Sequence, residues 1–368
     1  MTRDERAVRN PLTDERVVVR EFISELAGSS RLEVLRTLQG RVMTPSDIDC
    51  HGPIARQTAS KHLTQFTDRG LTKPTAGECG YELTAGGKVI VDAFERCLEQ
   101  VDRDALTHLS GSTHALPLLR TLSEYPARPN ELARNTPGSP SRPTVQRELQ
   151  MFAEHGWSME VDGHHQITHA GKRVLDAYDE LGVTVEQVME KAPWFQRLDP
   201  GHADVPVAAL DGAKLYVSSP DSPGIVLAAA LKLCDPRLDR FRVLTSIFNP
   251  RLFRAYDMLL KLGLKGEAIV DASLYERLHE EGMEHFLDDS DYNAFDIYRL
   301  EVPLTLGIGI YDEQQVAIGV YNEAGGGEHI AMILSTNDAI VEWGAGLFES
   351  FRKKARPASE PDSEIVSR

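Results

Sequence analysis

Cysteine is scarce in this sequence, and long apolar runs are missing. The chain has four cysteines in 368 residues, and they form no Cys-x-x-Cys pair or Cys/His cluster. This spacing argues against a structural zinc and favours reduced, buried thiols. No apolar run reaches the length of a membrane span, and MTRDERAVRN lacks the apolar stretch of a secretory signal. We therefore expect a cytoplasmic protein with no membrane partner.

Positive charge is also in short supply. The formal net charge is −16, which argues mildly against nucleic-acid binding. The deficit is uneven, because residues 196–368 hold 17 Lys/Arg against 28 Asp/Glu, whereas residues 1–110 hold 15 against 17. The near-neutral N-terminal part softens the objection. An acidic chain with more Arg than Lys fits a halophilic source, and an ordinary acidic protein remains the alternative.

Signatures of catalysis are absent from the sequence. There is no Ser/His/Asp or Cys/His pattern, no phosphate loop and no His-x-Lys pair of the phospholipase type. Gly307-x-Gly309 falls inside an expected strand, and the acidic run HFLDDSDYNAFD lacks the spacing of a calcium loop. We expect no enzyme activity, no catalytic residue, no cofactor and no metal site.

An internal repeat is what the sequence does contain. ITHAGKRVLDAY, residues 167–178, repeats LTAGGKVIVDAF, residues 83–94, and LRTL recurs at the same offset of 84 residues. Upstream, SSRLEVLRTLQG and THALPLLRTLSEYP each space leucines for one helix. TPSDI and RPNEL each place Pro at the first turn of a short second helix. A duplicated structural unit is the simplest explanation.

The rest of the repeat identifies that unit. IARQTASKHLTQFTDRGL and PSRPTVQRELQMFAEHGW align at an offset of 86 residues as a third helix. SMEVDGHHQIT alternates around Asp162-Gly163, a strong hairpin signal, and KPTAGECGYELT takes the same place in copy one. Thr84 and Thr168 then cap a final helix. Three helices, a two-stranded wing and a helix predict two tandem winged helix-turn-helix domains.

Winged helices place the N-terminal residues of the third helix in the major groove of double-stranded DNA. Arg suits guanine, Gln suits adenine, and Thr suits a thymine methyl or a phosphate. The residues predicted to contact DNA are Arg56, Gln57, Thr58, Ser60, Lys61, His62 and the wing residue Lys73 in copy one, with Arg142, Thr144, Gln146 and Arg147 in copy two. Glu148 replaces His62 in copy two, and a carboxylate there would be repelled by phosphate unless it reads a cytosine amino group.

Alternatives remain for both copies. A winged helix can also contact proteins, and copy two could dimerise or brace copy one instead of binding DNA. Helix 17–28 either packs on copy one or joins a dimer interface. Helix 88–106 either connects the two copies rigidly or pairs with its symmetry mate.

The periodicity changes after a Pro/Gly-containing linker. Strands are expected at 213–219, 241–247, 267–273 and 295–302, with helices at 223–234, 250–262 and 274–282 between them. An antiparallel meander follows, with turns at Asp312-Glu313 and Gly325-Gly326-Gly327, and a last helix closes the domain. The predicted domains are 16–106 and 107–186 (winged helices), 187–205 (linker), 206–354 (α/β domain with a mixed sheet) and 355–368 (disordered tail).

The arrangement resembles a family of archaeal, chiefly haloarchaeal and methanogen, winged-helix transcriptional regulators with a methanogenesis-regulator (Fil-type) effector domain. SRPTVQRELQMFAEHGW and GIGIYDEQQVAIGVYNEAGG…STNDAIVEWGAGLFESFR carry the resemblance. It implies a DNA-binding regulator, repressor or activator, that forms a homodimer and senses a small-molecule or protein effector. An interaction scaffold, and an α/β enzyme with a DNA-binding appendage, remain as alternatives.

Overall fold

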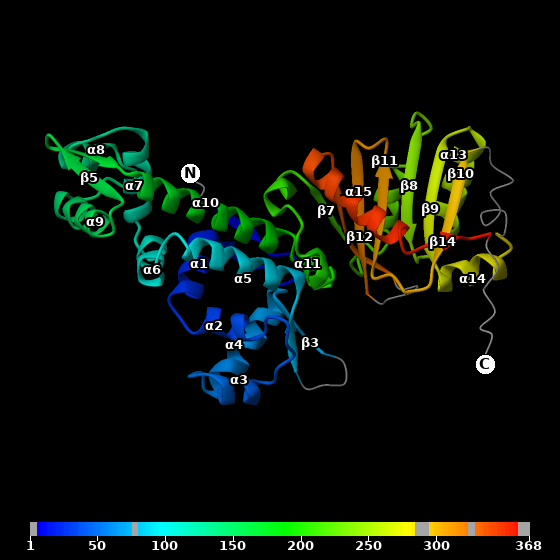
Figure 1. Ribbon diagram of the computed structural model, residues 1–368, viewed down its shortest axis with the longest axis horizontal. Helices are drawn as coiled ribbons and strands as arrows, with labels where there is room; N and C mark the ends of the chain where they lie inside the picture. Colours follow the sequence, from blue (N-terminus) through cyan, green and yellow to red (C-terminus); the bar gives the residue numbers. More distant parts are fainter. Residues whose placement is uncertain (1–5, 76–79, 284–293, 323–327, 360–368) are drawn as a thin grey trace. The chain divides into compact units, whose positions relative to one another are not determined.

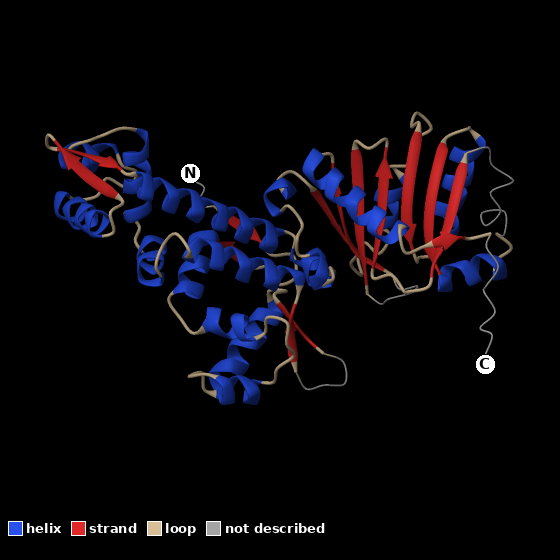
Figure 2. Cartoon of the chain, viewed as in Figure 1, coloured by secondary structure: helices blue, strands red, loops and turns tan. Residues whose placement is uncertain are grey.

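A computed structural model describes residues 6–75, 80–283, 294–322 and 328–359. The chain folds into two compact units, Met1–Ala192 and Pro193–Arg368. Figure 1 labels their helices and strands, and Figure 2 colours them by secondary structure. The first unit is mostly helical, and the second is built on one large sheet.

Copy one of the repeat begins with a helix ahead of the expected three. A short hairpin, β1 (Ala7–Arg9) and β2 (Arg16–Val18), leads into α1 (Val19–Ala27). The three helices follow as α2 (Arg31–Thr37), α3 (Pro45–His51) and α4 (Arg56–Asp68). The wing is β3 (Thr72–Pro74) with β4 (Tyr81–Leu83), and α5 (Ala85–Leu98) leaves the domain.

Copy two repeats this order element by element. It consists of α6 (Arg103–Gly111), α7 (Ala115–Glu124), α8 (Pro129–Asn135), α9 (Arg142–Glu154), the wing strands β5 (Ser158–Val161) and β6 (His164–Ile167), and α10 (His169–Glu190). The expected helix 88–106 is therefore two helices, because Asp102 caps a new one by accepting a bond from the Ala105 N–H. The second copy begins at Arg103, ahead of the boundary predicted at 107.

The two copies pack through equivalent helices. Helix α1 lies against its counterpart α6, and α5 lies against its counterpart α10. Arg103 at the start of α6 donates to the Ala27 carbonyl at the end of α1, at 2.7 Å. Between the exit helices, Arg96 forms an ion pair of 3.2 Å with Glu180. Helix 17–28 thus packs within its own chain, against copy two.

One glycine in each exit helix explains why the repeat keeps Gly at this place. A Cβ at Gly87 would overlap the carbonyl oxygen of Leu71, and a Cβ at Gly171 would overlap that of Trp157. Both carbonyls lie at the entrance to a wing, and each accepts a bond from the Thr that caps the exit helix. The close approach of helix to wing therefore requires a residue without a side chain.

The second unit confirms the mixed α/β domain. Its sheet runs in the order β14-β10-β9-β8-β11-β12-β13-β7. Strands β8 (Arg240–Thr245), β9 (Lys265–Asp271) and β10 (Phe295–Leu300) are parallel to one another. Strands β11 (Leu306–Tyr311), β12 (Gln315–Tyr321) and β13 (His329–Ser335) form the expected antiparallel meander. Strand β7 (Lys214–Val217), expected among the strands that alternate with helices, pairs antiparallel with β13. The Asp312-Glu313 turn has positive φ at both residues.

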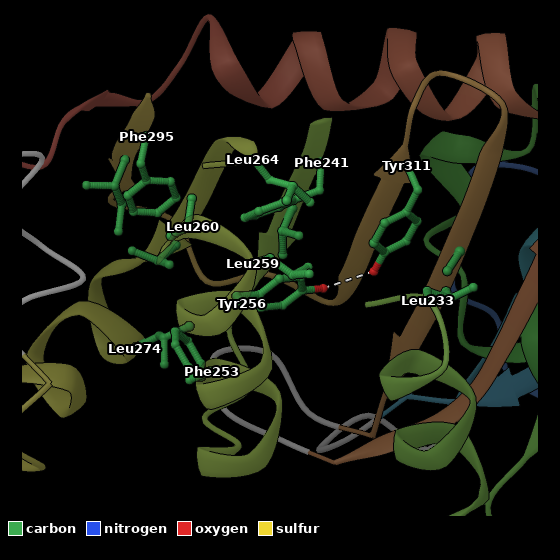
Figure 3. Close-up of a cluster of buried hydrophobic side chains, with 14 of the residues drawn as sticks. Leu233, Phe241, Phe253, Tyr256, Leu259, Leu260, Leu264, Leu274, Phe295 and Tyr311 are labelled. Carbon is green, nitrogen blue, oxygen red and sulfur yellow. Dashed lines mark hydrogen bonds between the residues drawn. The ribbon is translucent and has the colours of Figure 1, made fainter. Parts of the chain in front are cut away.

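Helices cover both faces of this sheet. Helices α12 (Ile225–Leu231), α13 (Pro250–Lys261) and α14 (Ala272–Glu280) contribute to a common apolar core on one face. Figure 3 shows this core, in which Tyr256 and Tyr311 bond through their hydroxyls at 2.9 Å. Helix α15 (Asp338–Arg352) packs on β11 and β12, where Gly344 lies against Val316. The short helix α11 (Ala192–Arg197) contributes Trp194, whose indole N–H donates to the Ile318 carbonyl.

The predicted disordered tail begins too early in the sequence. Residues Arg356–Pro357 form β14, which pairs with the edge strand β10. Ala358 is buried in the apolar core, and its N–H donates to the Ile297 carbonyl. Backbone pairing at an open sheet edge orders this segment, and that pairing leaves no periodic signal in the sequence. Residues 360–368, the acidic loop around Asp288 and the Gly325-Gly327 turn lie outside the described residues.

Candidate nucleic-acid interface

Helix α4 has one buried and one exposed side. Ala59, Leu63 and Phe66 are buried, and they follow the helical spacing of i, i+4 and i+7. The preceding α3 is fixed by a capping box, in which Thr44 accepts from the Asp47 N–H and Asp47 accepts from the Thr44 N–H. This anchored pair of helices presents the opposite side of α4 to solvent.

That exposed side carries the contact residues predicted for copy one, with one exception. Arg56, Gln57, Thr58, Ser60 and Lys61 are all exposed. Within the described ranges, the side chains of Arg56 and Lys61 have no hydrogen bond or ion pair. No side chain caps the start of α4, where Ala55 stands at the N-cap. Arg56 and the uncapped backbone N–H groups therefore lie at the helix start, and Lys61 lies five residues further along the exposed side.

His62 is the exception, and its prediction as a DNA contact is wrong. Its side chain is buried, with 7% exposure, and its Nε2 lies 3.2 Å from the Ser30 hydroxyl at the start of α2. Burial, and after it the charge of Arg31, lowers the pKa of His62 and keeps the ring neutral. The position falls on the apolar stripe, one residue before Leu63, so the helical spacing was the signal that the sequence reading missed.

Lys73 lies on the wing as expected, with a partner. It is 37% exposed, and its Nζ lies 3.3 Å from Glu82 on the neighbouring strand. Exposed pairs of this kind are weak. Lys73 stays a candidate contact, although its charge is partly neutralised in the free protein.

Helix α9 presents a more enclosed face. Arg142, Gln146 and Arg147 are exposed, and Thr144 is half-buried. The Ser141 hydroxyl caps the helix by accepting from the Thr144 N–H, and it lies 2.8 Å from the Thr144 hydroxyl. Arg147 donates to the Glu148 carboxylate at 3.0 Å. Copy two therefore offers fewer free donors at the start of its third helix.

Glu148 faces the protein, so the expected repulsion from phosphate does not arise. The residue is fully buried, and its carboxylate accepts from His108 Nε2 at 2.6 Å and from the Ser112 hydroxyl at 3.4 Å. Burial raises its pKa, but the hydrogen bonds from His108 and Arg147 outweigh burial and leave the pKa below the ordinary value. His62 and Glu148 thus occupy the same inward position, each tied to the preceding helices of its own copy.

The structure describes three of the four cysteines. Cys97 is buried, and burial raises the pKa of Cys97 and of the partly buried Cys234 to about 12. Cys50 is exposed, contrary to expectation, and Cys79 lies outside the described residues. Across the described ranges, no cluster of three His, Cys, Asp or Glu could hold a metal ion.

The second unit has an apolar cavity of about 30 Å³ between α13 and strands β8 to β10, lined by residues such as Val243, Phe253 and Ile297.

Comparison with protein families agrees with this domain order. The model of the HVO_A0261 N-terminal domain matches residues 20–106 and again residues 103–190. The model of the methanogenesis regulatory protein FilR1, middle domain, matches residues 230–354. By these matches, both copies of the repeat belong to the HVO_A0261 N-terminal domain family, and most of the second unit belongs to the middle-domain family of a methanogenesis regulatory protein. The first match includes α1 and the second includes α6, so the added N-terminal helix is part of the repeated unit.

Solved structures give weaker likenesses. TrmBL2, described as an archaeal chromatin protein, is 13% identical with a TM-score of 0.32, covering 72% of this chain and 99% of that one. NucT from Helicobacter pylori is 16% identical with a TM-score of 0.32, covering 39% and 98%. Nuc from Salmonella typhimurium, a phospholipase D family member, is 14% identical with a TM-score of 0.31, covering 39% and 97%. No curated protein matches. No described helix is long and apolar enough to cross a membrane.

Proposed function

We propose that the protein is a sequence-specific regulator of transcription whose copy one reads double-stranded DNA through α4. The observation that carries this proposal is the exposed side of the N-terminal half of α4. There, Arg56 and Lys61 lack partners within the described residues, and Gln57, Thr58 and Ser60 are exposed as well. Desolvating these cations against DNA breaks no internal ion pair. Arg56 and Gln57 are suited to base edges, and Lys61 to phosphate.

Copy two has a lesser role at DNA in this proposal. Its Arg147 already forms an ion pair with the buried Glu148 carboxylate. The Ser141 hydroxyl already accepts a hydrogen bond from the Thr144 N–H at the start of α9. Arg142 and Gln146 remain as secondary contacts. The second unit acts as the sensor or as a dimerisation domain for a cytoplasmic homodimer, and we assign it no catalytic step.

Fluorescence anisotropy with the promoter fragment upstream of the protein's own gene, and with a scrambled fragment, tests the proposal. Arg56→Ala/Lys61→Ala should weaken promoter binding about 30-fold, because a base contact and a phosphate contact are lost together. The matched control, Arg142→Ala/Arg147→Ala, should change affinity by less than about threefold. Equal losses in the two double variants would reject the assignment of reading to copy one.

A KCl series separates the two kinds of contact. Replacing Lys61 alone should reduce the salt dependence of binding by about one unit of slope in log–log form. Replacing Gln57 should leave that slope unchanged and reduce the preference for promoter over scrambled DNA. A chain of net charge −16 should show a shallower slope than its number of basic residues suggests.

A further inference from the structure

The third helix ends in the same turn in both copies, but the turn has different surroundings. Gly70 follows α4 and Gly156 follows α9, both with positive φ. In each copy, the N–H of the next residue bonds a carbonyl five residues back, that of Phe66 in copy one and of Phe152 in copy two. Gly70 is buried, whereas Gly156 is exposed. The burial of Gly70 therefore comes from neighbours that the turn itself does not supply.

Two distant parts of the chain cover the end of α4. A Cβ at Gly70 would meet the Leu12 side chain at 2.6 Å and the Ala192 carbonyl oxygen at 3.4 Å. A Cβ at Gly156 would meet no described atom within 4 Å. Leu12 belongs to the turn between β1 and β2, and Ala192 follows the end of α10. This hairpin has no equivalent in copy two, because residues 99–102 join α5 directly to α6.

Asn10 connects the hairpin, the end of α4 and the end of α10. It is fully buried, and its side-chain amide donates to the Arg69 carbonyl at 3.2 Å and to Met189 Sδ at 3.8 Å. Its side-chain oxygen accepts from the Leu12 N–H at 2.9 Å. An uncharged side chain that donates and accepts at once suits this set of partners. Asn10 therefore fixes the position of the last turn of α4 relative to α10.

The end of α10 leads along the chain into the second unit. Ala192, which lies against Gly70, is also the first residue of α11. Two residues further on, the fully buried Trp194 donates its indole N–H to the Ile318 carbonyl in β12, at 3.0 Å. A displacement of this part of α11 would be passed along the backbone to Ala192. The end of α4 lies against that residue.

We propose that Asn10 is a positioning residue that couples α4 to the end of α10, so that the second unit regulates DNA reading through copy one. The inference rests on the proposed function, in which α4 reads DNA. The third helix of copy two ends at the exposed Gly156, and it receives no such contact from the described residues. Because coupling between two sites is reciprocal, DNA bound at α4 should in turn alter the end of α10.

Hydrogen exchange of the full-length chain, with the promoter fragment as the probe, tests the coupling. Saturating promoter DNA should slow the exchange of amides 186–192 at least about threefold in the wild type. Asn10→Ala should abolish this response while the start of α4 is still protected by DNA. If Asn10→Ala fails to fold, Met189→Leu removes the sulfur acceptor at nearly constant volume and should weaken the response in the same way. A wild-type chain without the response, or an Asn10→Ala chain that keeps it, would overturn the proposal.

The two glycines give a matched pair for affinity. Asn tolerates positive φ, so Gly70→Asn and Gly156→Asn place the same side chain on the same turn. Gly70→Asn should weaken promoter binding at least about fivefold, because the new side chain displaces Leu12 or Ala192. Gly156→Asn should change the affinity by less than about twofold. Equal losses in anisotropy would show that the turn alone, without its contact to Ala192, sets the affinity.

A measurement without DNA separates this inference from the proposed function. In the free chain, Trp194→Phe removes the hydrogen bond to the Ile318 carbonyl. It should speed the exchange of the Gly70 amide at least about threefold and leave that of Gly156 unchanged. Unchanged exchange at Gly70 would reject the coupling even if promoter DNA binds. Faster exchange at Gly70 alone, in a chain that does not prefer its promoter, would support the coupling and reject DNA reading by α4.

Discussion

The two winged-helix copies share a skeleton and differ where they meet their surroundings. Both have five helices and a wing, both cap the exit helix with Thr, and both need Gly near its start. Copy one leaves the cations of α4 unpaired within the described residues. Copy two caps α9 with Ser141 and pairs Arg147 with Glu148. Duplication thus preserved the internal contacts, while the surfaces specialised.

Substituting the glycine near the start of each exit helix should have the largest effect on stability, and the effect should be similar in the two copies. Gly87→Ala and Gly171→Ala should each lower the free energy of unfolding by about 3 kcal/mol, because the new methyl overlaps backbone that cannot move away. Gly346→Ala is the control: it lies in a helix where an added methyl would meet nothing within 4 Å, and it should be neutral or stabilising. Urea denaturation measures these changes, and a substitution that is tolerated in only one copy would contradict the equivalence of the two glycines.

Substitutions at the inward position of the third helix, His62 in copy one and Glu148 in copy two, should lower the free energy of unfolding by different amounts. Glu148→Ala should cost about 2–3 kcal/mol, since it leaves His108 and Ser112 facing a cavity and removes a buried, bonded carboxylate. His62→Ala should cost about 1–2 kcal/mol, since it removes a neutral ring with one close polar neighbour. Equal costs in urea denaturation would show that burial, and not the charged network, sets the energy at this position.

Acid should affect the copies in different pH windows. His62 has a pKa below its ordinary 6.5, so the unfolded chain binds its proton first and stability falls as pH drops below about 6.5. Glu148 has a pKa below its ordinary 4.5, so its contribution is complete above about that pH and is lost as pH falls through the lowered folded value. Comparing wild type with His62→Gln and with Glu148→Gln across pH would show the two windows, and a common window would contradict the assignment.

Substitutions at the N-caps of α3 and α8 should give the smallest difference in stability between the copies. Thr44→Ala should destabilise copy one by about 1 kcal/mol, because the Asp47 N–H loses its acceptor. In copy two the residue is Arg128, which provides no side-chain cap bond, so Arg128→Thr should stabilise by about 0.5 kcal/mol. Thermal unfolding measures both, and a destabilising Arg128→Thr would show that Arg128 has another role.

The sequence predicted those features whose cause is local. The repeat, the wing turn at Asp162-Gly163 and the order of helices and strands in the second unit follow from periodicity and turn chemistry, and the structure has them. His62 was misplaced because its basic character was given more weight than its helical spacing. The roles of Glu148 and Ala358 were missed because their partners lie 40 and 61 residues away, at His108 and Ile297. The start of α6 was missed because Asp102 interrupts an otherwise continuous apolar pattern.

The packing of α1 on α6 and of α5 on α10 has a consequence for how the protein behaves in dilute solution. Two domains that are joined in one chain meet at an effective concentration set by the short connection between them. This effective concentration is far above the concentration of a regulator in solution. Their association therefore does not vary with the amount of protein present. A change in expression level would alter how many chains meet at a promoter, while each arriving chain would already carry both winged helices in fixed relation.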